Sequence, residues 1–403
     1  MSPLQQFGRR SLKALTISVV VLLLAGCVAR EPARTTPPRL DALSRACRFL
    51  WSQQSADGGW HSETYGLMRS GQSLTPYVLH ALLRTAEEFR EEPQGARDRA
   101  LAFIRANVNA DGALGMADKM VMDYPTHATS FAIRCLVLAG NKQDRALIDR
   151  MCDWLARHQF TEQLGFEPAH VAYGGFGFGG VGVSPQRTGV MDVVHTRNAL
   201  QALREAGRSS DAICKAAQIF LRMVQRHPDD KRAQPAVPGE PEGTQANTYD
   251  GGFYFSPAFL AMNKGLYESA RDGKAAYFRS YATATSDGLL ALLAAGVAAS
   301  DSRVIDAQQW LLARPEYETT AGLPPDAPTP WGEAMFHYHL ATRAEALAAM
   351  NAPGNWRQKT REVLKPRQRA DGSYRNENTP LMKEDDPLLC TAITVNALLR
   401  CTS

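Results

Sequence analysis

Two aspartate–histidine pairs are the first groups in this sequence that could transfer protons. Asp123 lies four residues before His127, and Asp192 lies three residues before His195, so each pair shares one face of a helix. Such a pair can act as acid and base, and two pairs near one cavity could hold a metal ion. An aspartate ahead of a helix can instead cap its first turn, as the proline two residues after Asp123 indicates. Capping or ligand contact is the favoured interpretation, and no complete metal site is predicted.

An acidic run near the carboxyl end of the chain offers a further pair of carboxylates. Asp385 and Asp386 directly precede Pro387, and Thr391 follows four residues after the proline. An aspartate before a proline makes a good helix cap, with proline in the first helical position. We therefore favour a capping role for these carboxylates and keep acid catalysis as the alternative.

Histidine and aromatic side chains are the candidates for contacts to a ligand. His337 and His339 flank a tyrosine and point to different faces of a helix, so one of them is expected to face a cavity. Two predicted loops are rich in aromatic rings, which suit an apolar polycyclic ligand or a stacked sugar ring. The candidate aromatic residues are Tyr173, Phe176, Phe178, Phe253, Tyr254 and Tyr281.

The glycine-rich stretch 173–180 contains a G-x-G-x-x-G match. A phosphate loop needs a strand before it and a helix directly after it, and neither is predicted here. The sequence therefore excludes nucleotide binding by this loop, and it predicts no cofactor.

A sixfold repeat predicts the elements that position these residues. Six apolar helical stretches each contain a threonine followed six positions later by a small residue. Little charge interrupts them, which is typical of helices buried on most sides. The repeated pairs are Thr75/Ala81, Thr129/Cys135, Thr196/Ala202, Thr285/Ala291, Thr342/Ala348 and Thr391/Ala397.

A more charged, amphipathic helix is predicted before each of these buried helices. In residues 147–158, for example, apolar positions recur at i, i+4, i+7 and i+8. Six exposed helices that alternate with six buried ones predict an all-α ring, in which outer helices shield inner helices around a central cavity. The predicted outer helices are 43–54, 96–108, 147–158, 212–225, 303–313 and 356–368.

The turns between the two helix types carry a second repeated pattern. Residues 54–60 and 368–374 fit Q-x-x-x-G-x-W with an aromatic residue at the last place, and residues 111–114 and 250–253 are degenerate copies. Glycine supplies the positive φ that ends a helix, and aspartate accepts local backbone hydrogen bonds. These turns resemble the QW motifs of squalene–hopene cyclases and the repeats of protein prenyltransferase β-subunits. The resemblance implies an α/α toroid of six helical hairpins over residues 40–403.

The catalytic motifs of those two families are missing or displaced. The cyclases place an acidic D-x-D-D motif directly before Thr-Ala on an inner helix, whereas more than one helical turn separates Asp385 and Asp386 from Thr391. The prenyltransferases bind zinc through an Asp-x-Cys pattern, and no predicted inner helix begins with one. The resemblance therefore implies the fold without the activity of a typical cyclase.

The first forty residues resemble the export signal of a bacterial lipoprotein. A basic region at residues 9–13 precedes an apolar run too short to span a bilayer, as in cleavable signal peptides. Residues 24–27, Leu-Ala-Gly-Cys, resemble a lipobox, which implies cleavage after residue 26 and acylation of Cys27 with palmitate-type chains. Residues 27–39 then form a lipidated, flexible tether. Val28 after the cysteine favours the outer membrane facing the periplasm, with the inner membrane as the alternative.

The net charge bears on nucleic acid as a partner, and the cysteines bear on whether the protein has disulfides. The formal net charge is +4, and removal of residues 1–26, which hold three basic and no acidic residues, lowers it to about +1. This balance gives no indication of nucleic acid binding. The six remaining cysteines form no C-x-x-C pair, so buried free thiols are favoured. A bridge from Cys47 to Cys390 or Cys401 is the alternative.

Three functions remain open at this point. The favoured one is a membrane-anchored toroid that binds an apolar ligand, a sugar or a protein in its central cavity. The alternatives are an enzyme acting on an isoprenoid lipid and a carbohydrate-active toroid, which would need two carboxylates facing each other across the cavity. Convergence of Asp123, Asp192 and either Asp385 or Asp386 in one pocket would favour chemistry, whereas separate helix caps would favour binding.

Overall fold

The computed structural model describes residues 38–118, 122–180, 182–240, 246, 248–265, 267–324 and 326–402, with side chains from residue 42 onward. Residues 39–403 form one compact unit. Cys27, the predicted signal peptide and most of the predicted tether lie outside the described residues, so lipidation stays a prediction. Among the described helices, none combines the length and the apolar character needed to cross a bilayer.

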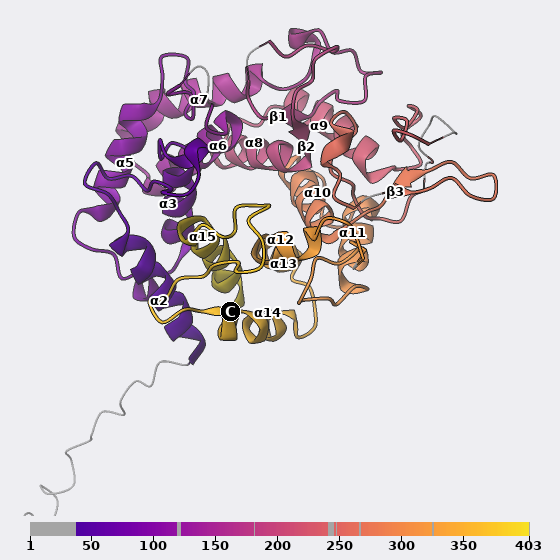
Figure 1. Cartoon of the computed structure of the whole chain (residues 1–403). Coiled ribbons are helices and arrows are strands. Elements are labelled where there is room, and N and C mark those ends of the chain that lie inside the picture. The colour runs from indigo at the N-terminus through magenta and orange to yellow at the C-terminus, as the bar shows by residue number, and fades with distance from the viewer. Residues whose placement is uncertain are drawn as a thin grey trace, which may run out of the picture. The chain divides into compact units, whose positions relative to one another are not determined.

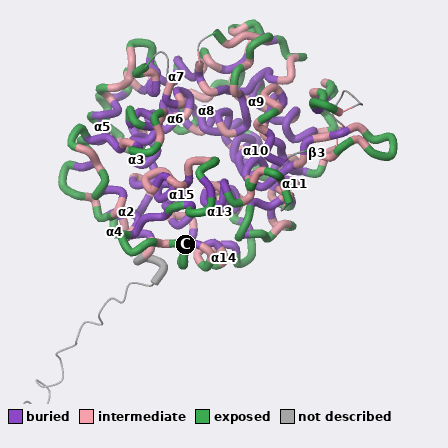
Figure 2. The backbone as a smooth tube through the Cα atoms, viewed as in Figure 1, coloured by how far each residue is buried: buried purple, intermediate pink, exposed green. Residues whose placement is uncertain are grey.

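Within the described residues, six inner helices form a closed ring, as the repeat predicts. Each packs against the next along the chain, and the last packs against the first (Figure 1). Most of their residues are buried, because outer helices cover them on one side and neighbouring inner helices on the others (Figure 2). The inner helices are α3 (Leu74–Arg84), α6 (Pro125–Ala139), α8 (Val193–Glu205), α10 (Ala282–Ala294), α13 (Phe336–Ala349) and α15 (Pro387–Leu398).

Six outer helices surround this ring and bury one face each. Their apolar faces pack on the inner helices and their charged faces are exposed, as amphipathic patterning requires. They are α2 (Pro38–Ser52), α5 (Ala96–Asn107), α7 (Arg145–Arg157), α9 (Asp211–Gln225), α11 (Ser302–Leu312) and α14 (Trp356–Leu364). All-α class and ring architecture are therefore as predicted, with helix ends within a few residues of the expected positions.

Short helices and two small hairpins complete the fold. β1 (Phe176–Gly177) pairs antiparallel with β2 (Met191–Asp192), and β3 (Tyr267–Glu268) with β4 (Tyr277–Phe278). Strands of two residues leave no alternation in the sequence, so none was predicted. The remaining elements are α4 (Glu87–Arg90), α12 (Trp331–Ala334) and the 3-10 turns η1 (Gly66–Met68), η2 (Lys142–Asp144), η3 (Glu162–Leu164), η4 (Leu260–Met262), η5 (Lys365–Arg367) and η6 (Leu399–Cys401).

The repeated threonines hold the turns against the inner helices. In the first hairpin the backbone N–H of Trp60 donates to Thr75 Oγ1 at 2.9 Å. The threonine thereby satisfies a buried backbone donor that lies outside regular secondary structure. The same bond runs from Leu114 to Thr129 at 3.0 Å, from Phe176 to Thr196 at 3.0 Å, from Phe253 to Thr285 at 3.1 Å and from Tyr374 to Thr391 at 2.9 Å.

Where the turn motif has its glutamine, that side chain ties the hairpin to the next one. Gln54 Nε2 donates to the Gly58 carbonyl in its own turn at 3.0 Å and to the Ala96 carbonyl in α5 at 2.9 Å. Gln368 closes the ring in the same way, because it donates to Ala42 in α2 at 2.8 Å. Gln159 bonds Gly174 and Ile213, and Gln225 bonds Gly251 and Arg303, although the sequence around both departs from the motif.

The fifth hairpin keeps the two helices but not the turn. The hydroxyl of Thr342 donates to the Tyr338 carbonyl of its own helix at 3.0 Å instead of serving a turn. The segment after α11 contains no Q-x-x-x-G-x-W pattern. Threonine spacing alone therefore identified this helix, and the described part of the turn before it lacks both the sequence motif and the threonine bond of the other hairpins.

The cysteines of the described residues are free thiols. Cys47, Cys390 and Cys401 are buried and unbridged, which excludes a disulfide among them in this structure. Cys135 and Cys152 are buried as well, and Cys214 is partly exposed. Burial raises the pKa of Cys47 and of Cys152 to about 12, so both thiols are inert nucleophiles.

Candidate functional site

The amino-terminal ends of the inner helices meet at one face of the ring. Glu384, before α15, accepts the backbone N–H groups of His337 and Tyr338 at the start of α13, at 3.0 and 2.8 Å. Most of the proton-transfer candidates lie on this face. We call the following residues the mouth cluster: Tyr65, Tyr124, His127, Phe178, Asp192, His195, Lys383 and Asp385.

Asp192 and His195 form a hydrogen-bonded pair at the start of α8. One carboxylate oxygen of Asp192 accepts the backbone N–H groups of Val194 and His195 at 2.8 and 2.9 Å, so this residue caps the helix. Its other oxygen lies 2.8 Å from His195 Nδ1. This contact favours the tautomer with the proton on Nδ1, which leaves Nε2 as an acceptor or base. One carboxylate is thus both a cap and the partner of a histidine.

Partly exposed aromatic rings lie beside this pair. The Phe178 ring centroid is 6.0 Å from that of His195 and 4.9 Å from that of Tyr124. His127 packs against Tyr77 with 5.3 Å between centroids. Burial, together with the nearby His195, lowers the pKa of His127 to about 3, so its imidazole is neutral at physiological pH. His127 therefore offers a hydrogen bond rather than a positive charge.

Asp385 belongs to the opposite side of this mouth. The Tyr65 hydroxyl donates to Asp385 Oδ1 in a short hydrogen bond, although the two residues are 320 positions apart. Lys383 Nζ lies 5.7 Å from the ring centroid of Tyr65 and 6.0 Å from that of Tyr124. Asp192 directly precedes α8 and Asp385 lies just before α15, and these two helices are separated by two inner helices in either direction around the ring (Figure 1).

Sequence patterns missed Tyr65, Tyr124, Lys383 and a buried lysine near the cluster. Lys264 Nζ lies 4.3 Å from the Phe255 ring centroid. Burial lowers the pKa of Lys264 to about 8, and the charge of Asp192 partly opposes this effect. No local pattern marks these residues, because closure of the ring and folding of the insertions bring them together.

Asp123 and Asp386 act as helix caps. Asp123 accepts the backbone N–H of Ser73 at 3.2 Å and the Ser70 hydroxyl at 2.7 Å, so it caps α3. The prediction that it caps its own helix, α6, is wrong. The reason is that Tyr124, with φ +47°, occupies the cap position of α6. Asp386 accepts the N–H groups at the start of α15 at 3.0 and 3.1 Å, which is the predicted role.

The side chains of the two histidines of α13 are not part of the mouth cluster, although the backbone N–H of His337 bonds Glu384, between Lys383 and Asp385. His337 Nδ1 is 2.8 Å from Thr394 Oγ1, and this histidine lines a pocket of about 320 Å³ between the last two hairpins. His339 Nε2 is 3.1 Å from the carbonyl oxygen of Glu316, in the segment that follows α11. Burial lowers the pKa of both imidazoles to about 3. Their side chains therefore diverge as expected, but neither belongs to the mouth.

The aromatic residues proposed for ligand contact serve mostly to pack the turns. Phe253 lies on Gly288 of α10, where a Cβ would approach its ring to 2.4 Å. Of the six candidates only Phe178 is partly exposed. The buried five are Tyr173, Phe176, Phe253, Tyr254 and Tyr281.

Charged side chains cross the middle of the ring, where a single central cavity was expected. Arg197 of α8 donates to Asp287 of α10 at 2.6 Å and also contacts Glu345 of α13. The Tyr338 hydroxyl donates to Asp287 at 3.0 Å. Asp287 is fully buried, and burial raises its pKa to about 6 although Arg197 opposes the shift. In the described part of the ring, the axis is therefore polar. No three potential metal ligands converge within the same described residues.

Solved structures of two kinds of enzyme share this architecture. The type II terpene cyclase MstE from Scytonema matches with 16% identity and a TM-score of 0.54, over 90% of this chain and 98% of that chain. A protein from Actinoplanes matches with 16% identity and a TM-score of 0.53, over 91% and 100%. The α-1,6-mannanase GH76A from Salegentibacter, solved with α-1,6-mannotriose, matches with 11% identity and a TM-score of 0.50, over 90% and 98%.

The chain is an α/α toroid. At such low identities the likeness extends to the fold alone. No family model and no curated protein matches the sequence. The function of this toroid therefore depends on its own residues.

Proposed function

We propose that this toroid binds a glycan at the mouth cluster, on the surface of a bacterial envelope membrane. The observation that carries the proposal is the combination of partly exposed rings with hydrogen-bonding groups. Tyr124 and Phe178 offer flat apolar faces, and His195, Lys383 and Asp385 offer acceptors and donors around them. A sugar ring presents an apolar face to stack and hydroxyls to bond, so it matches both features.

The charged axis favours a glycan over an isoprenoid. The neighbours named above include a cyclase solved with a geranylgeranyl substrate and a mannanase solved with a trisaccharide, so the fold accepts either class. An isoprenoid chain needs a deep apolar chamber, because a buried charge facing it would stay unsolvated. Here Arg197, Asp287 and Glu345 occupy the middle of the ring. The proposed ligand therefore stays at the mouth.

Glycoside hydrolysis is the second candidate function. Glycosidases use two carboxylates, and Asp192 and Asp385 precede inner helices on opposite sides of the ring. Asp192 already accepts three hydrogen bonds from protein groups, and Asp385 accepts one from Tyr65. The capping and pairing of these carboxylates favour binding as the primary function.

Phe178→Ala is expected to weaken oligosaccharide binding about tenfold, because loss of one stacking ring costs roughly 1–1.5 kcal/mol. The measurement is calorimetric titration of the full-length protein with a panel of oligosaccharides that includes α-1,6-mannotriose. Mass spectrometry of the same samples detects shortened products, which would indicate hydrolysis. The unfolding temperature should change little, since Phe178 is partly exposed.

The matched control is Phe89→Ala. Phe89 is also a partly buried phenylalanine, but it lies in α4 after the carboxyl end of α3, away from the mouth. Binding should be unchanged in this variant. Retention of a polyprenol and of no oligosaccharide, or equal affinity of the Phe178→Ala protein and the wild type, would contradict the glycan assignment.

Cys27→Ser is expected to release the protein from the membrane fraction. The lipobox-like sequence before Cys27 supports acylation of its thiol, and serine offers no thiol to acylate. Two or three acyl chains give durable anchoring, whereas the remaining tether has no apolar segment to replace them. Metabolic labelling with a palmitate analogue, followed by fractionation, measures both effects. Labelling of the serine variant would contradict lipidation at this position.

A further inference from the structure

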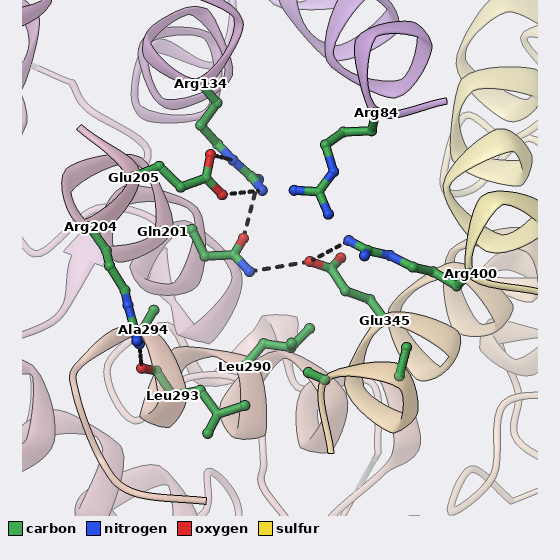
Figure 3. Close-up of a pocket in the computed structure, with 12 residues that line it drawn as sticks. Arg84, Arg134, Gln201, Arg204, Glu205, Leu290, Leu293, Ala294, Glu345 and Arg400 are labelled. Carbon is green, nitrogen blue, oxygen red and sulfur yellow. Dashed lines mark hydrogen bonds and ion pairs between the residues drawn. The ribbon is translucent and has the colours of Figure 1, made fainter. Parts of the chain in front are cut away.

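The face of the ring opposite the mouth cluster opens into a pocket of about 490 Å³. Residues near the carboxyl ends of the inner helices line it, so it is separated from the mouth by the length of these helices (Figure 3). Four of the lining residues are arginines and two are glutamates. They are Arg84, Arg134, Arg204, Arg400, Glu205 and Glu345.

Both glutamates of this pocket are already engaged. Glu205 accepts a two-pronged hydrogen bond from Arg134, at 3.0 and 2.8 Å. Glu345 is shared between Arg197 of the ring axis and Arg400, whose guanidinium lies 3.7 Å away. The carboxylates therefore have no capacity left to neutralise a further cation.

Arg204 has no carboxylate partner among the described residues, and neither does Arg84. Among the described residues Arg84 has no hydrogen bond and no ion pair, and it is partly exposed. Figure 3 shows its guanidinium directed into the pocket, between those of Arg134 and Arg400. Four arginines against two glutamates leave two positive charges in excess.

This excess of positive charge contributes to lowering the pKa of two neighbouring basic groups, Arg400 and His80. The pKa of Arg400 is lowered by burial and by the charges of Arg84, Arg134 and Arg197, although Glu345 opposes the shift. His80, one turn before Arg84 on α3, is buried with both ring nitrogens unpaired. Burial, followed by the charges of the same arginines, lowers its pKa well below the usual value.

Helix capping does not explain all of these arginines. Basic residues near a helix carboxyl end interact favourably with its dipole and its unpaired carbonyls. Arg204 fills that role, because it donates to the Leu293 carbonyl at the end of α10. Within the described residues, Arg84 and Arg400 make no such bond to a carbonyl.

One side of the pocket is apolar. Leu290 and Leu293 of α10 lie on the side of the pocket away from Arg84 and Arg134 (Figure 3), and Ala294, Ala348 and Ala349 line the pocket as well. A ligand that filled this space would place a charged group on one side and hydrocarbon on the other. A volume of this size is typical of sites for small organic ligands.

We propose that this pocket binds the phosphate group of an amphiphile. A phosphate monoester carries a charge of about −1.5 to −2 at neutral pH, which matches the two charges in excess. Guanidinium groups bind phosphate oxygens through two parallel hydrogen bonds, so Arg84 and Arg400 can clamp it from two sides. The apolar side then contacts the carbon chain. This site is independent of the glycan proposed at the mouth.

The test compares a free phosphate with a phosphate on a lipid. Full-length protein in a non-ionic detergent is titrated with inorganic phosphate, dihexanoyl phosphatidic acid and uncharged dihexanoylglycerol. We expect phosphatidic acid to bind at least tenfold more tightly than inorganic phosphate, and dihexanoylglycerol not to bind. Arg84→Gln should lower the affinity for both phosphates at least tenfold, and Arg84→Lys should restore part of it.

Folding and binding are distinguished by the unfolding temperature. Without ligand, Arg84→Gln should leave it unchanged or raise it, because Arg84 adds only like-charge repulsion. The matched control is Arg145→Gln, which alters an exposed arginine of α7 paired with Asp149 and should bind like the wild type. Absence of phosphate binding to the wild type, or equal binding by Arg84→Gln, would overturn the site. Equal affinity for phosphatidic acid and inorganic phosphate would overturn the role of the apolar side.

Discussion

Gly174→Ala is expected to destabilise the protein by more than about 3 kcal/mol, a large part of the stability of a typical domain. Gly174 has φ +85°, and a Cβ there would lie 1.8 Å from the carbonyl oxygen of Ala216 in α9. The obstacle is backbone and not a movable side chain, so the outer helix would have to shift. Urea unfolding followed by circular dichroism measures the loss, and the soluble yield serves if little protein folds.

The matched control for this substitution is Gly207→Ala. Gly207 has φ +69°, but no heavy atom lies within 4 Å of a Cβ built on it. Only the left-handed backbone conformation is then strained, at a cost of about 1–2 kcal/mol. If both variants lost the same stability, the close approach of the turn to α9 would contribute nothing, contrary to our argument.

The same close approach occurs at four other turns, which explains why the repeat contains glycine. A Cβ on Gly58 would lie 2.4 Å from the Arg99 carbonyl oxygen in the next outer helix, and one on Gly372 would lie 2.4 Å from that of Arg45. A Cβ on Gly112 would lie 2.5 Å from the Arg150 carbonyl oxygen, and one on Gly251 would lie 2.8 Å from that of Asp306, both in the next outer helices. Turn chemistry, visible in the sequence, accounts for the positive φ. Contact with the next hairpin, which is not visible there, makes glycine necessary.

Repetition is what made the fold predictable from the sequence. A threonine or glutamine that makes the same bond in several hairpins leaves a periodic signal, and Thr75 and Gln54 illustrate the two kinds. The fifth hairpin shows the limit of this reasoning. There Thr342 fits the spacing, yet its hydroxyl bonds its own helix.

The candidate site was predictable only where its contacts are local. Asp192 and His195 are three residues apart, so helical geometry alone brings them together. Tyr65 and Asp385 meet because the ring closes, and no spacing rule connects residues so distant in sequence. Asp123 was assigned to its own helix because a cap on the neighbouring inner helix has no sequence signature.

Charges along the ring axis were overlooked for a related reason. Each inner helix has few charged residues, and Arg197 or Asp287 alone resembles an isolated exception in an apolar segment. Their partners come from other hairpins, so the network exists only in the closed ring. Burying an unpaired charge costs too much free energy to be tolerated. A charged residue in an apolar inner helix therefore predicts an oppositely charged partner, although the sequence does not identify that partner.

Arg197→Met is expected to destabilise the protein by about 3–5 kcal/mol at pH 8, because it leaves the buried carboxylate of Asp287 without its counter-charge. Arg197 donates to Asp287 at 2.6 Å and contacts Glu345, and Asp287 is fully buried. Met preserves much of the volume, so loss of packing is a minor contribution. The matched control is Arg145→Met, which breaks an exposed ion pair with Asp149 and should cost no more than about 1 kcal/mol.

The loss caused by Arg197→Met should shrink as the pH falls. Burial raises the pKa of Asp287 to about 6 even with Arg197 present, and without this arginine the pKa rises further. A carboxyl group whose pKa is raised in the folded state stabilises the fold below its unfolded pKa, and this contribution is lost as the pH rises through the folded value. The variant should therefore be closer to the wild type at pH 5 than at pH 8. Unfolding free energies at both values test this, and a loss independent of pH would mean that missing contacts, rather than an unpaired carboxylate, destabilise the variant.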